Sequence, residues 1–292
     1  MPPSLTQNFT KGVLLITFAV MLFALADVLT KHLTMLYSVS LVVALRYAVN
    51  LLLLVGFYAP KQGLALLKTN RTTLVLVRAA CLSAASLTMG IALRYMPVGE
   101  TVAIIYISPI IVMILAIPFL GERVPLIGWI GAAVGFFGVL LIMRPGAGLN
   151  PTGVALALVN AGFAAAYALL SRTLATTETT PALLFYTALV GVLAFGGALL
   201  WNGLGPLPVG IDWLYLLALG ALATIGHVLF TSAYREAPAS LLAPVNYMHL
   251  VWAGILGWLV FGHMPDALSM LGMGLVTAAG VAVALRSQFA KP

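Results

Sequence analysis

The chain has 292 residues, and only 7% of them are Asp, Glu, Lys or Arg, whereas roughly a quarter of the residues in soluble domains are charged. Hydrophobic residues make up 62% of the sequence, and the net charge is +7. So few polar side chains cannot cover the surface of a globule in water. The composition therefore excludes a soluble fold and predicts a protein embedded in lipid.

Ten apolar runs are long enough to cross a bilayer as helices, since a hydrocarbon core needs about 20 helical residues. They do not alternate in polarity as the strands of a membrane barrel would. The connections of about 4 to 13 residues leave no room for a soluble domain. The predicted fold class is an all-α polytopic membrane protein with spans at 12–30, 38–58, 72–93, 101–120, 126–143, 154–170, 182–200, 213–234, 239–261 and 267–285.

Charged residues occur inside the first three spans, where they are costly and tend to face the bundle interior. Asp27 has two candidate partners, Lys31 four residues further on at the end of the first span and Arg46 in the second span. Arg78 in the third span either extends to the lipid headgroups or meets a substrate carboxylate. Asp27, Arg46 and Arg78 are therefore candidates for a charge or proton role.

Neutral hydrogen-bonding and aromatic side chains mark the third, fourth, sixth, eighth and ninth spans. Spacings of seven in the sixth span and of three in the ninth predict that these groups share a helix face. Each of them alone could simply join two helices by a hydrogen bond, but together they suit a cavity for a small amphipathic solute. No metal site is expected. The predicted substrate-binding residues are Asn160, Tyr167, Asn246, His249, Trp252, Tyr106, Tyr247, Ser86 and His227.

Prolines and glycines in the predicted spans indicate two different structural features, helix kinks and close helix packing. Pro109, Pro118 and Pro244 each remove a backbone hydrogen bond and predict kinks. The fifth span carries a stripe of small residues that includes Gly138, and the tenth carries Gly272. Such stripes are typical of close helix packing, so these two spans are expected to lie away from any central cavity.

The sequence resembles itself at a constant offset of 141 residues. Each copy holds five spans, and an odd number makes the second copy enter the membrane from the opposite side. The segments 1–146 and 147–292 are therefore predicted to be inverted repeats, which occur mainly in transporters that work by alternating access. Pairs related by the offset include Lys31 and Arg172, Arg94 and Arg235, Pro97 and Pro238, Tyr106 and Tyr247, and Gly121 and Gly262.

Basic residues outside the spans predict the orientation of the chain. Nine lie on one set of span ends and three on the other, and the positive-inside rule assigns the richer side to the cytoplasm. Both termini are then expected to be cytoplasmic, with the chain in the cell (inner) membrane. The nine are Lys11, Lys61, Lys68, Arg71, Arg123, Arg172, Arg235, Arg286 and Lys291, and the three are Lys31, Arg94 and Arg144.

The stretch 92–142, ALRYMPVGETVAIIYISPIIVMILAIPFLGERVPLIGWIGAAVGFFGVLLI, resembles the EamA-type repeat of the drug/metabolite transporter superfamily. The matching elements are the Leu-Arg-Tyr-x-Pro entry, Pro109, the Gly-Glu-Arg at 121–123 and the glycine-rich fifth span, together with Arg46. The second copy departs from this pattern at Leu250 and His263. The resemblance implies a ten-helix exporter of small metabolites, and among such exporters those of amino acids, including aromatic ones, look closest.

Three other functions are alternatives to amino acid export. An enzyme is disfavoured because the chain has none of the common catalytic motifs. An exporter of drugs or other metabolites and a channel-like facilitator remain alternatives, although no charge ring or repeated carbonyl filter is evident. The expected partners are a small-molecule substrate and the lipid bilayer, without nucleic acid, cofactor or metal. The oligomeric state stays open, and a monomer is compatible with the sequence.

Overall fold

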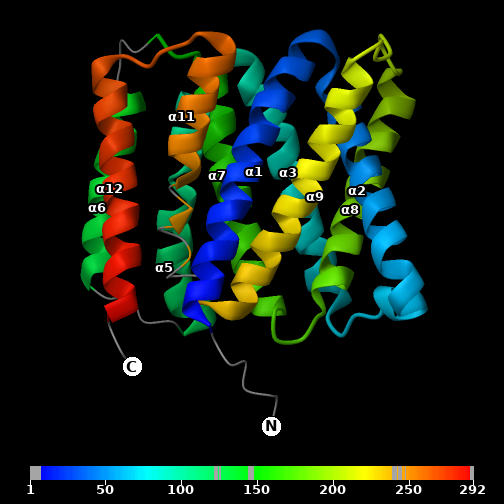
Figure 1. Cartoon of the computed structure of the whole chain (residues 1–292), viewed down its shortest axis with the longest axis horizontal. Coiled ribbons are helices and arrows are strands. Elements are labelled where there is room, and N and C mark those ends of the chain that lie inside the picture. The colour runs from blue at the N-terminus through cyan, green and yellow to red at the C-terminus, as the bar shows by residue number, and fades with distance from the viewer. Residues whose placement is uncertain are drawn as a thin grey trace.

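The computed structural model describes residues 8–121, 124, 126–143, 148–238, 242, 245–246 and 248–289. No strand occurs among these residues, and the helices stand side by side with both chain ends at the same end of the bundle (Figure 1). The helices are α1 (Phe9–Leu36), α2 (Val39–Gln62), the 3₁₀ turn η1 (Gly63–Leu67), α3 (Thr72–Tyr95), α4 (Val98–Ile105), α5 (Ser108–Leu120), α6 (Leu126–Met143), α7 (Pro151–Leu174), α8 (Thr180–Asn202), α9 (Asp212–Glu236), α11 (Met248–Phe261) and α12 (Ala267–Phe289).

The helices agree with the ten predicted spans. In the described part of the chain, seven helical segments are long and apolar enough to cross a membrane, and α4 with α5 forms one of them. Three shorter apolar helices, Leu126–Ile142, Met248–Phe261 and Ala267–Ala279, lie at the fifth, ninth and tenth predicted positions. The prediction of an all-α polytopic membrane protein is therefore confirmed.

Local sequence signals explain where several helices begin and end. The side chain of Asn8 accepts a hydrogen bond from the Lys11 amide at the start of α1, and that of Asn150 accepts from two amides at the start of α7. Such caps satisfy amides that have no partner within the helix. Gly121 after α5 and Gly262 after α11 both have φ of 65°, a left-handed conformation that glycine adopts without strain. These two glycines are related by the 141-residue offset.

The fourth predicted span is broken into α4 and α5 at Tyr106 and Ile107. Pro109 has no amide hydrogen and cannot bond to the carbonyl of Ile105, which lies four residues earlier. The Tyr106 amide is shared between the carbonyls of Val102 and Ala103, and the Ile107 amide donates to the carbonyl of Ile104, three residues earlier. The kink predicted at Pro109 is therefore present, whereas Pro118 lies inside α5 without breaking it. Pro244 lies outside the described residues.

Helix packing has the symmetry expected of two repeats. α1 packs against α9, and its counterpart α7 packs against α3. In the same way α2 packs against α9, whereas α8 packs against α3. Two further pairs, α2 with α8 and α6 with α12, lie at opposite edges of the bundle (Figure 1) and join equivalent helices. Exchanging the two halves therefore reproduces the packing.

Two long basic side chains repeat one contact in the two halves. The Nζ atom of Lys31 donates to the carbonyls of Leu93 and Met96 at the C-terminus of α3, with both distances 2.8 Å. The Nη1 atom of Arg172 donates to the carbonyl of Tyr234 at the end of α9, at 3.0 Å. Lys31 and Arg172 are 141 residues apart, as are Leu93 and Tyr234. A cation at a helix C-terminus satisfies free carbonyls and opposes the negative end of the helix dipole.

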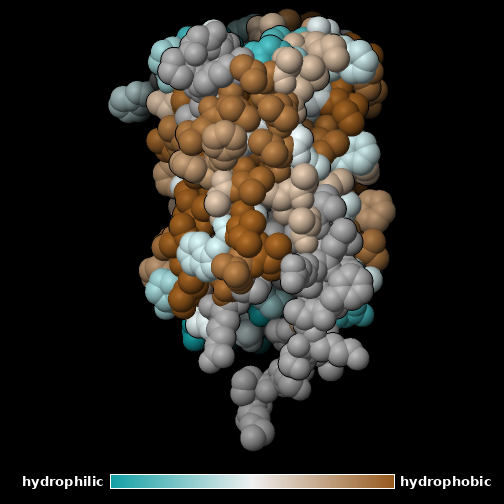
Figure 2. Space-filling view, turned by 90° about the vertical axis from the view of Figure 1, so that its left-hand side faces the viewer, coloured by the Kyte–Doolittle hydropathy of each residue, from teal (hydrophilic) through white to brown (hydrophobic). Residues whose placement is uncertain are grey.

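α6 and α12 form a lateral pair at one edge of the bundle. A Cβ atom added at Gly138 would lie 2.6 Å from the carbonyl oxygen of Gly272, and one added at Gly272 would lie 2.5 Å from that of Gly138. The helices therefore touch through backbone, as the small-residue stripes predicted. The outer face of this pair is predominantly hydrophobic (Figure 2), with exposed side chains that include Trp129, Phe137 and Leu271. This surface suits contact with lipid.

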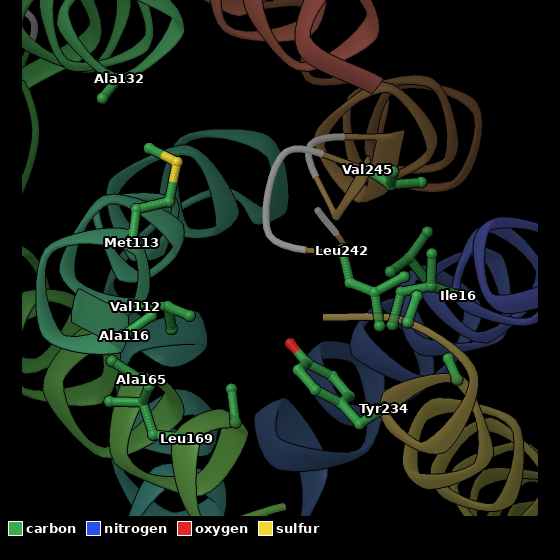
Figure 3. Close-up of a cluster of buried hydrophobic side chains, with 14 residues drawn as sticks. Ile16, Val112, Met113, Ala116, Ala132, Ala165, Leu169, Tyr234, Leu242 and Val245 are labelled. Atoms are coloured by element: carbon green, nitrogen blue, oxygen red, sulfur yellow. The ribbon is translucent and has the colours of Figure 1, made fainter. Parts of the chain in front are cut away.

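A cluster of buried apolar side chains packs between the centre of the bundle and the end that carries the termini. It joins α1, α5, α6, α7 and α9 with Leu242 and Val245. Figure 3 shows Val112 and Leu169, from α5 and α7, on one side, and Tyr234 and Leu242 on the other. Val112 and Tyr234 also line the cavity described next, so this cluster supports one end of it.

Candidate substrate cavity

A cavity of about 210 Å³ lies between the two repeats. Its walls come from α1, α2, α3, α4 and α5 of the first repeat and from α7, α9, Asn246 and α11 of the second. α1 and α2 were not among the five spans expected to line it. The lining is mostly apolar with a few polar groups, as in small-molecule sites generally. Those polar groups are Asp27, Thr30, Arg46, Ser86, Tyr106, Ser108, Asn160, Tyr167, His227, Tyr234, Asn246 and His249.

Arg46 brings a positive charge to the cavity wall from α2. Its Nη2 atom donates to the hydroxyl of Ser86 at 2.5 Å, and that hydroxyl lies 2.9 Å from the Tyr47 hydroxyl. No Asp or Glu within the described ranges forms an ion pair with Arg46. A guanidinium has five N–H donors, so most of those on Arg46 are available to a bound anion.

Asp27 brings a negative charge to the same cavity from α1. Its Oδ2 atom lies 3.0 Å from the Nε2 atom of His249, and the two side chains are 14% and 13% exposed. The two atoms are close, but their geometry is not that of a hydrogen bond. Neither atom has a hydrogen-bond partner in the part of the chain that the structure describes. Neither suggested partner is used, since Lys31 caps α3 and Arg46 bonds to Ser86. Asp27 instead faces a histidine of the other repeat.

Arg78 neither extends to the lipid headgroups nor lines the cavity. Its side chain is fully buried, and its guanidinium donates to five oxygen atoms of the second repeat. The contacts join α3 to α7, α8 and α9. The sequence around Arg78 alone could not predict these partners, because they lie on other helices. The acceptors are the Ser171 hydroxyl at 2.8 Å, the Leu183 carbonyl at 3.2 Å, the Thr187 hydroxyl at 2.9 Å, the Tyr167 hydroxyl at 2.9 Å and the Thr231 hydroxyl at 3.0 Å.

Three predicted residues line the cavity but already have protein partners. Asn160 donates to the carbonyl of Ala85 at 2.5 Å and to the hydroxyl of Thr88 at 3.1 Å. The Tyr167 hydroxyl accepts from Arg78 and lies 3.3 Å from the Nδ1 atom of His227. The Asn160 amide donors therefore hold α7 against α3, and the Tyr167 hydroxyl connects the cavity wall to the Arg78 network.

The polar residues of the ninth predicted span lie in two different environments. Asn246 and His249 line the cavity, whereas Trp252 does not and packs beside the buried cluster around Leu250 and Val276. Three residues along a helix rotate a side chain about 60° less than a full turn. Trp252, which is two such steps from Asn246, therefore points about 120° away from it. Tyr106 lines the cavity at the break between α4 and α5, with its ring centroid 5.8 Å from that of His249. Tyr247 lies outside the described residues.

A second cavity, of about 220 Å³, lies toward the C-terminal end of α11 and is lined in part by Lys31, Glu100, Phe261 and His263. The Nε2 atom of His263 lies 2.9 Å from the Oε1 atom of Glu100. No group of three or more His, Cys, Asp or Glu side chains suited to a metal ion occurs in the described part of the chain. The first cavity is the candidate site, because most of the predicted site residues line it and none of those that the structure describes lines the second.

Comparison with known proteins gives the family. The EamA-like transporter family matches residues 10–144 and 151–285, and these two segments both start and end 141 residues apart. The chain belongs to the EamA-like transporter family. The family model thus matches the chain twice, once in each half, and the symmetric packing agrees with two repeats; the bounds 1–146 and 147–292 stay a prediction.

Individual relatives are transporters of small molecules. The pseudopaline exporter CntI of Pseudomonas aeruginosa is 27% identical, with 93% of this chain and 95% of the relative covered. A riboflavin transporter of Rhizobium johnstonii is 26% identical, with 92% and 89% covered, and an S-adenosylmethionine uptake transporter of Rickettsia bellii is 26% identical, with 87% and 86% covered. A solved crystal structure with 22% identity covers 94% of this chain and 98% of its own, with a TM-score of 0.76, and shares the fold. The EamA-like chain is therefore a multi-pass membrane transporter of small molecules.

Proposed function

We propose that this EamA-like transporter exports zwitterionic metabolites, in the first place amino acids including aromatic ones, by alternating access through the cavity between its repeats. The observation that carries the proposal is the presence of Arg46 and Asp27 in one mostly apolar cavity. An ionisable residue inside a membrane protein marks a substrate or ion path by default. Two opposite charges in one such cavity match a substrate that carries both a carboxylate and an ammonium group.

Each part of an amino acid has a partner in this cavity. The carboxylate binds Arg46, because a guanidinium forms strong paired hydrogen bonds with carboxylates. The ammonium group binds Asp27. An aromatic side chain packs among Phe23, Tyr106 and Phe230, all of which line the cavity, since aromatic rings attract one another beyond the effect of buried area.

The broken helix and the inverted repeats support a carrier. Discontinuous helices line the central sites of many transporters, and inverted repeats rock against each other around such a site. The break at Tyr106 and Ile107 lies in the cavity wall. We place the chain in the cell (inner) membrane with both termini in the cytoplasm, and we infer export from the resemblance described above and from the similarity to a pseudopaline exporter.

The test compares phenylalanine with analogues that lack one charge, using purified protein in proteoliposomes. Phenylalanine should bind more tightly than phenethylamine or 3-phenylpropionate. Arg46→Gln should weaken binding of phenylalanine while leaving phenethylamine nearly unaffected, because only phenylalanine has a carboxylate. A hydrogen bond to a charged group contributes about 1.5–3 kcal/mol, so the expected loss is roughly tenfold to hundredfold.

Arg94→Gln is the matched control, because Arg94 is an exposed residue outside the cavity lining. It should bind and transport phenylalanine like the unmodified protein. Transport should saturate and accelerate when unlabelled substrate is present on the opposite side. Equal losses for phenylalanine and phenethylamine in Arg46→Gln, or flux at channel rates, would contradict the proposal.

A further inference from the structure

The Asp27 and His249 pair crosses the boundary between the two repeats. Asp27 lies on α1 of the first repeat and His249 on α11 of the second, and these two helices pack against each other. Both side chains line the cavity, and their facing atoms are 3.0 Å apart. Motion of one repeat against the other therefore acts directly on this contact.

The surroundings of the pair contain few other charges. Of the titratable or charged residues that line the cavity, α2 contributes Arg46, α7 contributes Tyr167 and α9 contributes His227 and Tyr234, while Tyr106 lies at the end of α4. α3 contributes the neutral hydroxyl of Ser86. Asp27 is thus the one carboxylate among the described lining residues. A proton on His249 has only this carboxylate to balance it, since Arg46 adds a second positive charge.

An incoming ammonium group needs the same carboxylate. If it takes Asp27, a protonated His249 is left as an unpaired cation in a mostly apolar cavity, where isolated charges are unstable. The imidazole ring can remove that charge by releasing a proton, which an arginine or lysine does far less readily at neutral pH. The contact between Asp27 and His249 is not a directional hydrogen bond, so its attraction comes from the two charges and ends when His249 becomes neutral.

We propose that His249 is an exchangeable counter-ion of Asp27, and that the transporter exchanges a proton for the ammonium group of its substrate. This inference rests on the function proposed above. On the cytoplasmic side the substrate ammonium binds Asp27, the Nε2–H bond of His249 breaks with its electron pair left on nitrogen, and the proton passes to water. On the outer side the substrate leaves and His249 takes a proton from water there. A proton therefore enters for each substrate that leaves, and no oxidant or reductant is needed.

The first experiment measures proton release on binding. Purified transporter in detergent is titrated with phenethylamine in two buffers of different ionisation enthalpy, at a mildly acidic pH where an imidazole can carry a proton. Phenethylamine carries the ammonium group without the carboxylate, so this test does not require that amino acids be the natural substrate. A proton should be released for each amine bound by the unmodified protein and none by His249→Gln. Binding without proton release, or no binding of the amine, overturns the inference.

The second experiment measures coupling in proteoliposomes with a trapped pH-sensitive dye. In the unmodified protein a pH gradient should drive phenylalanine uphill and protons in the opposite direction. His249→Gln should lose this driving effect, whatever rate of exchange of labelled for unlabelled phenylalanine it retains. Its matched control is His32→Gln, because His32 lies on α1 against Tyr215 and outside the cavity lining; it should remain coupled.

The outcomes separate the two proposals. Phenylalanine exchange without proton movement in the unmodified protein overturns the coupling and leaves the proposed substrate class intact. Proton release on amine binding without phenylalanine exchange overturns the substrate class and leaves the role of His249 intact. Continued pH-driven transport by His249→Gln overturns the assignment of the proton to that residue.

Discussion

At the scale of single residues, Arg78 shows how an intramembrane charge can serve the structure instead of the substrate. It is fully buried, and its five hydrogen bonds join α3 to α7, α8 and α9. Its guanidinium also lies 4.4 Å from the centre of the Tyr167 ring, a cation–π distance. Arg46 has the same chemistry but faces the cavity. The two arginines therefore have different surroundings, and only Arg46 is proposed to contact substrate.

Arg78→Met should destabilise the fold. The substitution keeps the apolar bulk but removes the charged donor to the hydroxyls of Ser171, Thr187 and Thr231, and a hydrogen bond to a charged group contributes about 1.5–3 kcal/mol. The midpoint of thermal unfolding in detergent should fall clearly below that of the unmodified protein. Arg94→Met changes an exposed arginine and should leave the midpoint in place. An Arg78→Met protein that unfolds at the original temperature would show that these hydrogen bonds add nothing to stability.

At the scale of helices, proline and glycine produce two different kinds of feature. α4 and α5 are separated by a break that opens onto the cavity, whereas α6 and α12 meet through backbone at the edge of the bundle. The break follows from a missing amide hydrogen at Pro109, and the close approach follows from missing Cβ atoms at Gly138 and Gly272. Proline thus shapes the site, while glycine holds the lateral pair together.

Gly138→Ala should weaken the contact between α6 and α12. Its Cβ atom would lie 2.6 Å from the carbonyl oxygen of Gly272 and 2.8 Å from the Val276 side chain, so the helices must separate. Gly274→Ala is the matched control, because a Cβ atom there meets nothing within 4 Å and alanine favours a helix by roughly 1 kcal/mol over glycine. The folded yield after detergent extraction should fall for Gly138→Ala and hold or rise for Gly274→Ala. A reverse order would mean that the pair does not depend on this close contact.

At the scale of the whole molecule, symmetry links the two halves and the two membrane faces. Lys31 caps α3 and Arg172 caps α9 in equivalent contacts. Because the repeats are inverted, these equivalent contacts lie toward opposite faces. The cavity lies between the halves, with Asp27 on one and His249 on the other. Rocking of the repeats would expose the same charges first to one side and then to the other.

The orientation can be tested with single cysteines in a Cys81→Ser background. Gln62 and Leu207 are exposed residues in connections that the inverted topology places on opposite sides of the membrane. A membrane-impermeant thiol reagent added to intact cells should label Leu207→Cys, and Gln62→Cys should react only after the membrane is opened. Leu207 is preferred to its neighbour Gly205, whose φ of 65° disfavours a side chain. Labelling of both cysteines from outside would contradict the predicted topology.

The sequence by itself determined the ten spans, the two repeats and the family resemblance. Lipid requires runs of about 20 apolar residues, and such runs are local features of the sequence. The constant offset of 141 residues between Lys31 and Arg172 or Tyr106 and Tyr247 is equally visible without coordinates. The set of polar residues at the cavity was also largely predictable, because polar groups are rare in these spans.

Only the tertiary structure decided what each polar side chain contacts. Arg78 meets Ser171 and Thr231, which are 93 and 153 residues away in the chain, and Asp27 meets His249 instead of either suggested partner. Trp252 turns away from the cavity although it follows the same spacing as Asn246 and His249. Helix periodicity fixes which residues share a face, but the rotation of each helix is set by packing against several neighbours at once. That rotation separates residues that hold the bundle together from residues that face the cavity.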